Sequence, residues 1–227
     1  MAPRGPLFLI VFVLAAFGCA QPEERPADTS APRSVAPAGS AATASRPRIV
    51  FLGDSLTAGY GLAQEQSIPS LIQQRLRDEG YDYDVVNAGV SGDTSAGGLS
   101  RLEWSLEGDV KVLVVELGGN DGLRGLPAAS MKRNLAEIIT RAKRRGIQVV
   151  LTGMEAPRNW GPQYVAEFRR VFSDLAKEHD VAFMPFFLEG VAVDARLNLP
   201  DGIHPNPEGA RIVAGNVWRI LEPLLED

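Results

Sequence analysis

The chain has 227 residues, of which 45% are hydrophobic and 22% are charged, and these values are typical of a globular protein. Its 23 basic and 28 acidic residues give a net charge of −5, which disfavours a nucleic-acid partner, because such proteins usually carry a basic surface. The single cysteine and the two histidines exclude an intrachain disulfide, a cysteine-based zinc site and a metal centre with several histidine ligands. We therefore expect neither a metal nor a cofactor.

The first 18 residues have the features of a signal peptide. A positive charge at Arg4 is followed by an apolar run, Leu7 to Phe17, that is too short to span a bilayer. Gly18 precedes Cys19, and this pair resembles the cleavage box of bacterial lipoproteins, in which Cys19 would become the lipidated first residue. Ordinary cleavage near Ala20 and an uncleaved anchor are the alternatives. All three predict export, and the first predicts a periplasmic protein held at a membrane.

Residues 19–47 predict a linker. They are mainly Ala, Pro, Ser, Thr and Gly and include no aromatic residue, so they cannot bury enough apolar surface to offset the entropy of ordering. We expect a disordered segment that holds the folded part away from a membrane. An inert leader is the alternative.

Apolar strands alternate with amphipathic helices over residues 48–227, which we expect to form one domain. The predicted strands are apolar runs at residues 49–52, 85–86, 110–117, 147–151 and 181–184. Helices are indicated by apolar residues at helical spacing over residues 68–76, 135–142, 164–175 and 212–224. Asn206 can cap the last helix, with Pro207 at its first position. This order predicts an α/β fold with a five-stranded parallel sheet covered on both faces.

Polar residues and glycines follow the predicted strands at the carboxyl ends, where parallel sheets bind their ligands. The segments concerned are Gly53–Ser55, residues 87–93, Gly118–Asp121 and, ahead of the last helix, Asp201–His204. We therefore expect a serine, a glycine-rich turn, an asparagine and an Asp/His pair to meet at one edge of the sheet.

These residue types are the components of a serine hydrolase site. A serine hydroxyl becomes a good nucleophile when a base lies within hydrogen-bond reach and a third group orients that base. The spacing of Asp201 and His204 lets the carboxylate reach the near ring nitrogen, which leaves the far nitrogen for Ser55. Donors for a developing oxyanion are the N–H groups of Ser55 and Gly92 and the Asn120 amide.

Four motifs resemble, in the same order, the blocks of the SGNH (GDSL) hydrolase superfamily. They are Gly53-Asp-Ser-Leu56, Asn87-Ala-Gly-Val-Ser-Gly-Asp-Thr94, Gly118-Gly-Asn-Asp121 and Asp201-Gly-Ile-His204. Residues 115–125 and Pro185-Phe-Phe187 resemble the branch of bacterial periplasmic multifunctional acyl-CoA thioesterases, lysophospholipases and arylesterases. The resemblance implies a flavodoxin-like three-layer α/β/α sandwich.

The same resemblance implies a role for each site residue. Ser55 would be the nucleophile, His204 the base and Asp201 its orienting partner, while Ser55, Gly92 and Asn120 would form the oxyanion hole. Gly89 is the alternative to Gly92, which we prefer because it matches the glycine that precedes Asp-Thr in the motif.

Two loops of this branch are expected to contact the substrate and to wall a shallow acyl groove. The residues concerned are Gly122, Leu123 and Arg124 in the first loop and Pro157 and Trp160 in the second. For two side chains a second interpretation stays open. Arg124 is alternatively a solvated loop residue, and Asp54 either orients the nucleophile loop or caps the following helix.

We expect a monomeric, exported serine esterase that hydrolyses carboxylic esters and thioesters through an acyl-enzyme. A carbohydrate O-acetylesterase on the same scaffold is the first alternative, and strict acetyl preference would favour it. A tethered protein that binds an acyl ligand without turnover is the second, and it would fail to hydrolyse a nitrophenyl ester. The chain contains no G-x-S-x-G motif, which excludes the nucleophile elbow of α/β-hydrolases.

Overall fold

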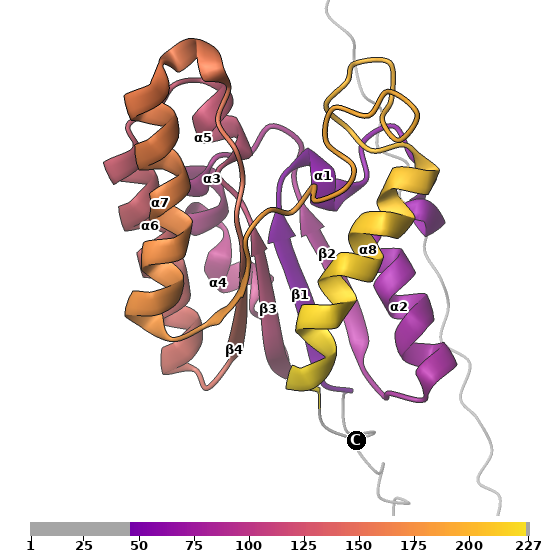
Figure 1. The fold of residues 1–227 in the computed structure, drawn as a ribbon. Helices are drawn as coiled ribbons and strands as arrows, with labels where there is room; N and C mark the ends of the chain where they lie inside the picture. Colours follow the sequence, from indigo (N-terminus) through magenta and orange to yellow (C-terminus); the bar gives the residue numbers. More distant parts are fainter. Residues whose placement is uncertain (1–45, 226–227) are drawn as a thin grey trace, which may run out of the picture. The chain divides into compact units, whose positions relative to one another are not determined.

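Five parallel strands form a single sheet in the order β2-β1-β3-β4-β5 in the computed structural model (Figure 1), which describes residues 46–225. The strands are β1 Arg48–Gly53, β2 Asp84–Gly89, β3 Val110–Glu116, β4 Gln148–Thr152 and β5 Ala182–Met184. This order is the flavodoxin-like one, so the predicted five-stranded parallel sheet is confirmed. The predicted signal peptide, Cys19 and nearly all of the predicted linker lie outside the described residues.

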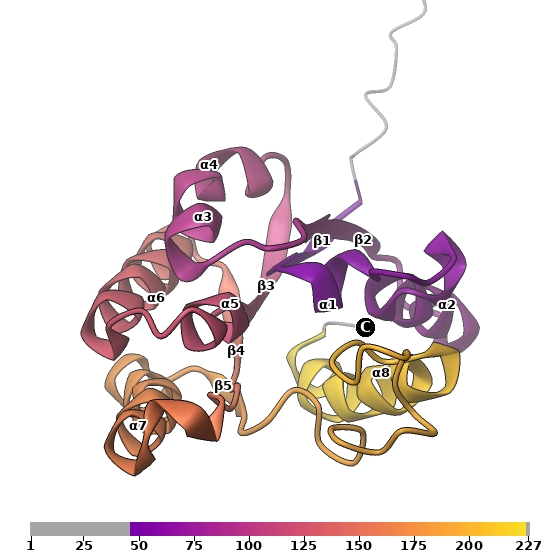
Figure 2. The same cartoon turned by 90° about the horizontal axis from the view of Figure 1, so that it is seen from above.

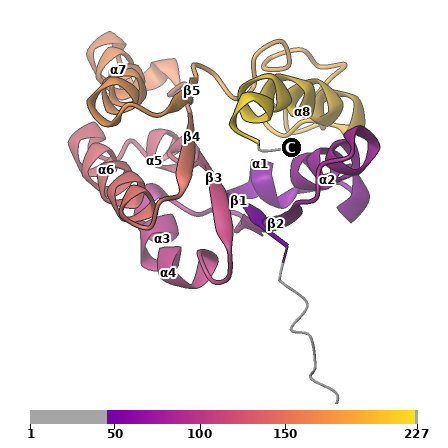
Figure 3. The ribbon, with the colours of Figure 1, turned by 90° about the horizontal axis from the view of Figure 1, so that it is seen from below.

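Helices cover both faces of the sheet and complete the three layers (Figures 2 and 3). One face is covered by α2 Ile68–Glu79 and α8 Pro207–Leu221. The other is covered by α3 Ser95–Ser100, α4 Leu102–Ser105, α6 Ala128–Arg144 and α7 Pro162–His179. Two short helices, α1 Ser55–Ala58 and α5 Gly119–Leu123, lie at the carboxyl ends of the strands, where the arrows point in Figure 1. Three 3-10 turns are η1 Gln64–Gln66, η2 Arg158–Trp160 and η3 Glu222–Leu224.

The core forms where the apolar faces of the long helices meet the sheet. The central strands are buried on both sides, as the near-continuous apolar runs of β1 and β3 require. The predicted cap of the last helix is confirmed, because the Asn206 side chain accepts hydrogen bonds from the N–H groups of Glu208 and Gly209, with Pro207 at the first position. No helix within residues 46–225 combines the length and apolarity that a bilayer span requires.

Strand β2 is longer than its sequence predicts. Residues 87–89 read as a turn, yet they pair with Phe51, Leu52 and Gly53 of β1. Parallel pairing with a buried neighbour therefore outweighs the local turn preference of Asn and Gly. The short helices α3, α4 and α5 also lack a sequence signal, since each has six residues or fewer, too few to show helical periodicity.

The outer edge of β2 is closed by a side chain rather than by another strand. The Gln73 side chain of α2 accepts a hydrogen bond from the Val85 N–H and donates one to the Tyr83 carbonyl, at 2.7 and 3.0 Å. The amide of Gln73 thus takes the place of a neighbouring strand at the beginning of β2.

Candidate active site

Ser55 is the first residue of α1 and follows directly on β1. The Asp54 side chain caps the helix by accepting a hydrogen bond from the Leu56 N–H at 3.0 Å. Helix α1 rests on the end of β2, where a β-carbon added to Gly89 would lie 2.3 Å from the Ala58 nitrogen. Glycine is therefore required at position 89, because the helix that carries Ser55 approaches the strand so closely.

His204 and Asp201 reach Ser55 from the loop that precedes α8. The Nε2 atom of His204 lies 2.9 Å from the Ser55 Oγ, and its Nδ1 atom lies 2.7 Å from an Asp201 carboxylate oxygen. The other Asp201 oxygen accepts hydrogen bonds from the N–H groups of Ile203 and His204. The structure thus brings together, in one hydrogen-bonded line, the three side chains that the sequence indicated.

The local backbone keeps Asp201 ionised. Hydrogen bonds from the N–H groups of His204 and Ile203, and then from the His204 ring, lower the pKa of Asp201 to about 2. An ionised carboxylate beside Nδ1 fixes the tautomer that leaves Nε2 free to accept the serine proton. It also stabilises the imidazolium that forms once the proton has moved.

Tyr60 is a site residue that the sequence did not single out. Its ring lies against the His204 ring with the centroids 4.6 Å apart, and 54% of the residue is exposed. Both rings border a small hollow beside Ser55 that is also lined by Leu62 and Ile68. Tyr60 lies in a turn-rich stretch, and nothing in its spacing indicates a partner about 140 residues later in the chain.

Two backbone N–H groups at this edge are free to receive an oxyanion. Neither the Ser55 N–H nor the Gly92 N–H donates to an acceptor within the part of the chain that the structure describes. Gly92 has a φ of +84°, which favours glycine, and a β-carbon there would contact only Arg124, at 3.7 Å. The Gly89 N–H is instead used by the Asn87 side chain at 3.0 Å, so the geometry favours Gly92 over Gly89.

Asn120, the third donor that the motifs indicated, lies close enough to Ser55 to bond to the preceding residue. Its side chain lies at the start of α5, and Nδ2 donates to Asp54 Oδ2 at 2.9 Å. One amide hydrogen is therefore held by Asp54, and the second is available for a substrate oxygen. Asp54 caps α1, which is one of the two roles considered for it, and it also accepts a hydrogen bond from Asn120, a contact that the sequence did not indicate.

Arg101, which the sequence did not single out, holds in place the loop that contains Gly92, called the glycine loop below. Its guanidinium donates to the Asp93 carboxylate at 2.6 Å, to the Ala88 carbonyl at 2.6 Å and to the Gly53 carbonyl at 2.9 Å. These bonds connect the loop that contains Gly92 to the end of β1. Two of the three acceptors are backbone carbonyls, which have no sequence signature.

The three residues predicted for the first substrate loop lie in three different environments. Arg124 donates to the Gly92 carbonyl at 2.8 Å, so its guanidinium contacts the glycine loop. Leu123 is 49% exposed and presents an apolar side chain at the surface. Gly122 is buried, and a β-carbon there would lie 3.0 Å from the Phe168 ring. The structure therefore places Leu123 and Arg124 at the surface of this loop but not Gly122.

The second predicted substrate loop contacts the first. The Trp160 ring packs on Gly125, where an added β-carbon would lie 2.7 Å from the indole. The neighbouring Tyr164 donates to the Leu126 carbonyl at 2.8 Å. Pro157 is half-buried ahead of η2, while Trp160 is 46% exposed.

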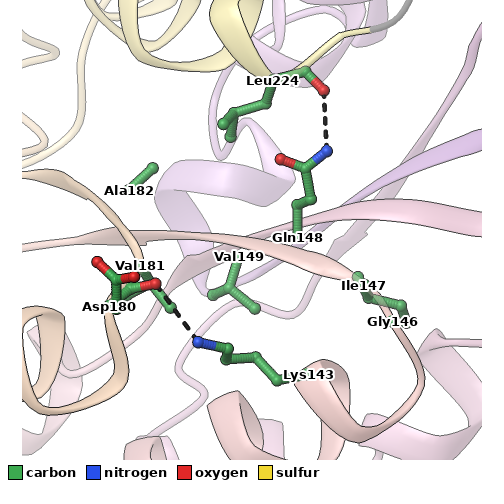
Figure 4. A pocket seen from close by; sticks show the side chains of 9 residues that line it. All are labelled: Lys143, Gly146, Ile147, Gln148, Val149, Asp180, Val181, Ala182 and Leu224. Carbon is green, nitrogen blue, oxygen red and sulfur yellow. Dashed lines mark hydrogen bonds between the residues drawn. The ribbon is translucent and has the colours of Figure 1, made fainter.

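A separate hollow opens at the other end of the strands from Ser55, between the amino ends of β4 and β5 (Figure 4). The Lys143 ammonium donates there to the His179 and Asp180 carbonyls, which caps the end of α7. Gln148 donates to the Leu224 carbonyl across the same hollow. Its polar groups are thus used in structural contacts. Within residues 46–225, no three His, Cys, Asp or Glu side chains are grouped closely enough to hold a metal ion.

Comparison with known proteins identifies the family. Residues 51–212 match the model of the GDSL-like Lipase/Acylhydrolase family. An esterase TesA of Pseudomonas aeruginosa is 47% identical over 178 residues, which cover 78% of this chain and 89% of the relative. An arylesterase of Vibrio mimicus is 40% identical over 176 residues, or 77% and 88% of the two chains.

A third relative and a solved structure agree with this result. A protein of Escherichia coli strain K12 named thioesterase 1/protease 1/lysophospholipase L1 is 36% identical over 178 residues, which cover 78% of this chain and 84% of the relative. A crystal structure of TesA superposes with a TM-score of 0.75 at 46% identity, and covers 79% of this chain and all of that one. The resemblance inferred from the four motifs is confirmed. The chain belongs to the GDSL-like lipase/acylhydrolase family and is a hydrolase of ester bonds.

Proposed function

We propose that the protein is a serine esterase and thioesterase in which Ser55 carries the acyl group. The observation that supports this most strongly is the line of hydrogen bonds from the Ser55 hydroxyl through His204 to Asp201, at 2.9 and 2.7 Å. The N–H groups of Ser55 and Gly92, which donate to no acceptor within residues 46–225, belong to the segments that follow β1 and β2. A nucleophile, its base and oxyanion donors are therefore available at the carboxyl ends of the strands.

In the acylation step, the Ser55 Oγ attacks the carbonyl carbon of the ester or thioester while its proton passes to His204 Nε2. The carbonyl oxygen becomes negative and accepts hydrogen bonds from the N–H groups of Ser55 and Gly92 and from the Asn120 amide. The tetrahedral intermediate collapses, the bond to the leaving alcohol or thiol breaks, and His204 gives its proton to the leaving group.

The deacylation step repeats this chemistry with water. His204 Nε2 takes a proton from the water as its oxygen attacks the acyl carbon on Ser55. The acid is released when the bond to Ser55 Oγ breaks and the proton returns from His204 to that oxygen. Asp201 stays ionised throughout, which its low pKa allows.

Exposed apolar side chains near the site favour acyl chains longer than acetyl. Leu123 and Trp160 are 49% and 46% exposed, on the two loops that meet at Gly125. Apolar surface of this kind stabilises a bound alkyl chain by roughly 0.8 kcal/mol for each methylene it buries. The relatives named esterase, arylesterase, thioesterase and lysophospholipase support the same broad substrate class for this chain.

A fluorophosphonate probe and an acyl-length series test this proposal. The probe is expected to label the wild-type protein on Ser55, located by mass spectrometry of the labelled peptide. Activity is expected on p-nitrophenyl esters and acyl-CoAs, with kcat/KM rising from acetyl to medium-length chains. Strict acetyl preference would favour a carbohydrate O-acetylesterase. Ligand retention without any hydrolysis would contradict the proposal and favour a binding protein.

We further propose that the protein is exported as a lipoprotein, with residues 1–18 removed, Cys19 lipidated and residues 19–47 acting as a linker to the hydrolase domain at residues 48–227. The support is the apolar run that ends at Gly18-Cys19 and the Ala/Pro/Ser-rich composition that follows. In bacterial cells the wild-type protein is expected in the membrane fraction, and the Cys19→Ser variant is expected to lose the lipid mass and its membrane retention. Equal fractionation of the two would contradict lipidation.

A further inference from the structure

Two buried acids lie directly beneath the nucleophile, and the proposed mechanism assigns no role to one of them. Asp54 is 2% exposed, and Glu116 is completely buried. Glu116 is the last residue of β3 and lies beside Gly53, its partner in the sheet. A carboxyl group at the buried end of a strand is costly to bury and therefore calls for a physical explanation.

The contacts of Glu116 are made with the nucleophile loop. Its Oε2 atom accepts hydrogen bonds from the Asp54 N–H at 3.2 Å and from the Thr57 hydroxyl at 2.9 Å. Its Oε1 atom is buried, and no N–H or hydroxyl group of the described chain donates to it. Oε1 is therefore the atom that can carry a proton.

The Asp54 carboxyl makes contacts that lead towards the substrate. Its Oδ1 accepts the Leu56 N–H, and its Oδ2 accepts the Asn120 amide at 2.9 Å. Two glycines leave room for the acid pair: an added β-carbon would lie 2.7 Å from Glu116 Oε2 at Gly53 and 3.2 Å from Asp54 Oδ2 at Gly119. The space around the pair is thus part of the motifs that carry Ser55 and Asn120.

The two carboxyl groups cannot both be ionised at this depth. No lysine or arginine of residues 46–225 forms an ion pair with either of them, and His204, on the neighbouring loop, is a titratable side chain that interacts electrostatically with Asp54. Burial raises the pKa of both groups, but at Asp54 this rise is opposed by hydrogen bonds from the Leu56 N–H, from Glu116 and from the Asn120 amide. The pKa of Glu116 is raised well above its usual range by burial and then by the Asp54 charge. A hydrogen bond between the two carboxyl groups then requires Glu116 to be the donor and Asp54 the acceptor.

We propose that Glu116 is a positioning residue of the oxyanion hole. As a neutral acid it donates a hydrogen bond to Asp54, and Asp54 in turn holds the Asn120 amide and the first turn of α1. With one amide hydrogen held by Asp54, the second hydrogen of Asn120 points in a fixed direction. This inference rests on the proposed function, because it concerns a donor that acts on the acyl oxygen.

Two substitutions of Glu116 separate a neutral donor from a charged acceptor. Glu116→Gln keeps an oxygen for the Asp54 N–H and Thr57 and places an NH₂ donor at Asp54, so it imitates the protonated acid. It is expected to keep kcat within about threefold of wild type. Glu116→Met keeps the volume of the side chain but removes the donor to Asp54. It is expected to lower kcat by about 10-fold or more with little change in KM. A displaced Asn120 amide would lose part of the rate effect of an oxyanion donor, which is usually about 10²–10³. Loss of activity in Glu116→Gln would overturn the proposal.

A double-mutant cycle shows whether Glu116 acts through Asn120. In the Asn120→Ala background the donor is already absent, so Glu116→Met is expected to lower kcat by a smaller factor than it does in the wild type. Equal factors in the two backgrounds would indicate a merely structural role and would overturn the proposal. Leu76→Ala, a core change on α2 away from the site, is the matched control and is expected to lower Tm without changing kcat.

The proton itself is detectable without measuring activity. An infrared difference spectrum between wild type and Glu116→Gln at pH 7 is expected to show the C=O stretch of a protonated carboxylic acid in the wild type only. Because the pKa of Glu116 is raised in the folded state, folding takes up a proton at pH values above the usual pKa of 4.5. The free energy of unfolding of the wild type therefore falls as the pH rises. The Tm of Glu116→Gln minus that of wild type should therefore increase from pH 5 to pH 8. Absence of both signals would overturn the proposal.

These outcomes are distinguishable from failure of the proposed function. If wild-type protein hydrolyses no ester or thioester, the serine esterase assignment fails, while the infrared band and the pH dependence of Tm still report on the proton. If the wild type is active and Glu116→Gln is not, the esterase assignment stands and the role of Glu116 as a neutral donor is wrong.

Discussion

Ser55→Ala is expected to lower kcat/KM for ester hydrolysis by at least about 10⁴-fold. The Oγ atom that lies 2.9 Å from His204 Nε2 is the proposed acyl acceptor, and alanine offers no atom in its place. The fold should be unaffected, because the α1 cap is made by Asp54 and not by the Ser55 side chain. Residual hydrolysis would come from water held near the oxyanion donors.

The measurement is initial-rate hydrolysis of a p-nitrophenyl ester, together with fluorophosphonate labelling and the circular dichroism spectrum. Ser173→Ala is a suitable control, because Ser173 is a half-buried serine of α7 whose hydroxyl donates to the Arg170 carbonyl of the same helix. Retention of labelling in Ser55→Ala with an unchanged fold would show that another residue is the nucleophile.

Asp201→Asn is expected to lower kcat/KM by about 10²–10⁴-fold. Asparagine keeps the shape and can still accept the backbone N–H groups of Ile203 and His204. It has no charge to stabilise the imidazolium, and its NH₂ group can donate to Nδ1 and so favour the wrong tautomer of His204. The effect should therefore appear mainly in kcat.

Asp194→Asn provides a matched control for this variant. Asp194 lies in the same loop region before α8, and its pKa is also lowered to about 2, in this case by hydrogen bonds from Arg196 rather than by a histidine. If the loss of any carboxylate from this loop lowered the activity, the two variants would lose activity equally. Similar activities of Asp194→Asn and Asp201→Asn would count against the orienting role of Asp201.

The same low pKa determines the charge of Asp201 on the acid side of neutrality. The pKa of Asp201 is lowered from its usual 3.8 to about 2, so Asp201 is ionised in the folded enzyme at all pH values above that range. Between pH 4 and neutrality Asp201 should therefore take up no proton, which is checked by following the NMR signal of its side-chain carboxylate carbon over this range. A carboxylate signal that titrates in this range would contradict an ionised Asp201. The stabilising effect of the bonded carboxylate is present above about pH 4 and is lost as the pH falls towards 2.

The convergence of the site could be predicted from the sequence because it follows from topology. In a parallel sheet the carboxyl ends of all strands lie at one edge, so residues after β1, β2 and β3 had to be neighbours. The Asp/His pair was placed there by its position just ahead of α8. Chain order and strand direction were therefore enough to bring Ser55 and His204 together.

The residues that hold this arrangement could not be predicted in the same way. Arg101 bonds mainly to backbone carbonyls, and Tyr60 contacts His204 only through the way two loops fold over each other. Glu116 gave one signal, an acidic residue directly after the apolar run at residues 112–115, but its partners become visible only when β1 and β3 are paired. Local pattern thus indicates which groups take part in the chemistry, while the contacts that orient them depend on segments far apart in the chain.

The Gln73 amide on the outer edge of β2 has a consequence for handling the enzyme in concentrated solution. An open strand edge exposes backbone donors and acceptors to which a strand from another molecule can add, and this is a common route to aggregates. Because the Val85 N–H and the Tyr83 carbonyl are already bonded to Gln73, the start of this edge cannot act as a template. The side chain thereby protects the beginning of β2 against the addition of a foreign strand, without adding a strand or a charge.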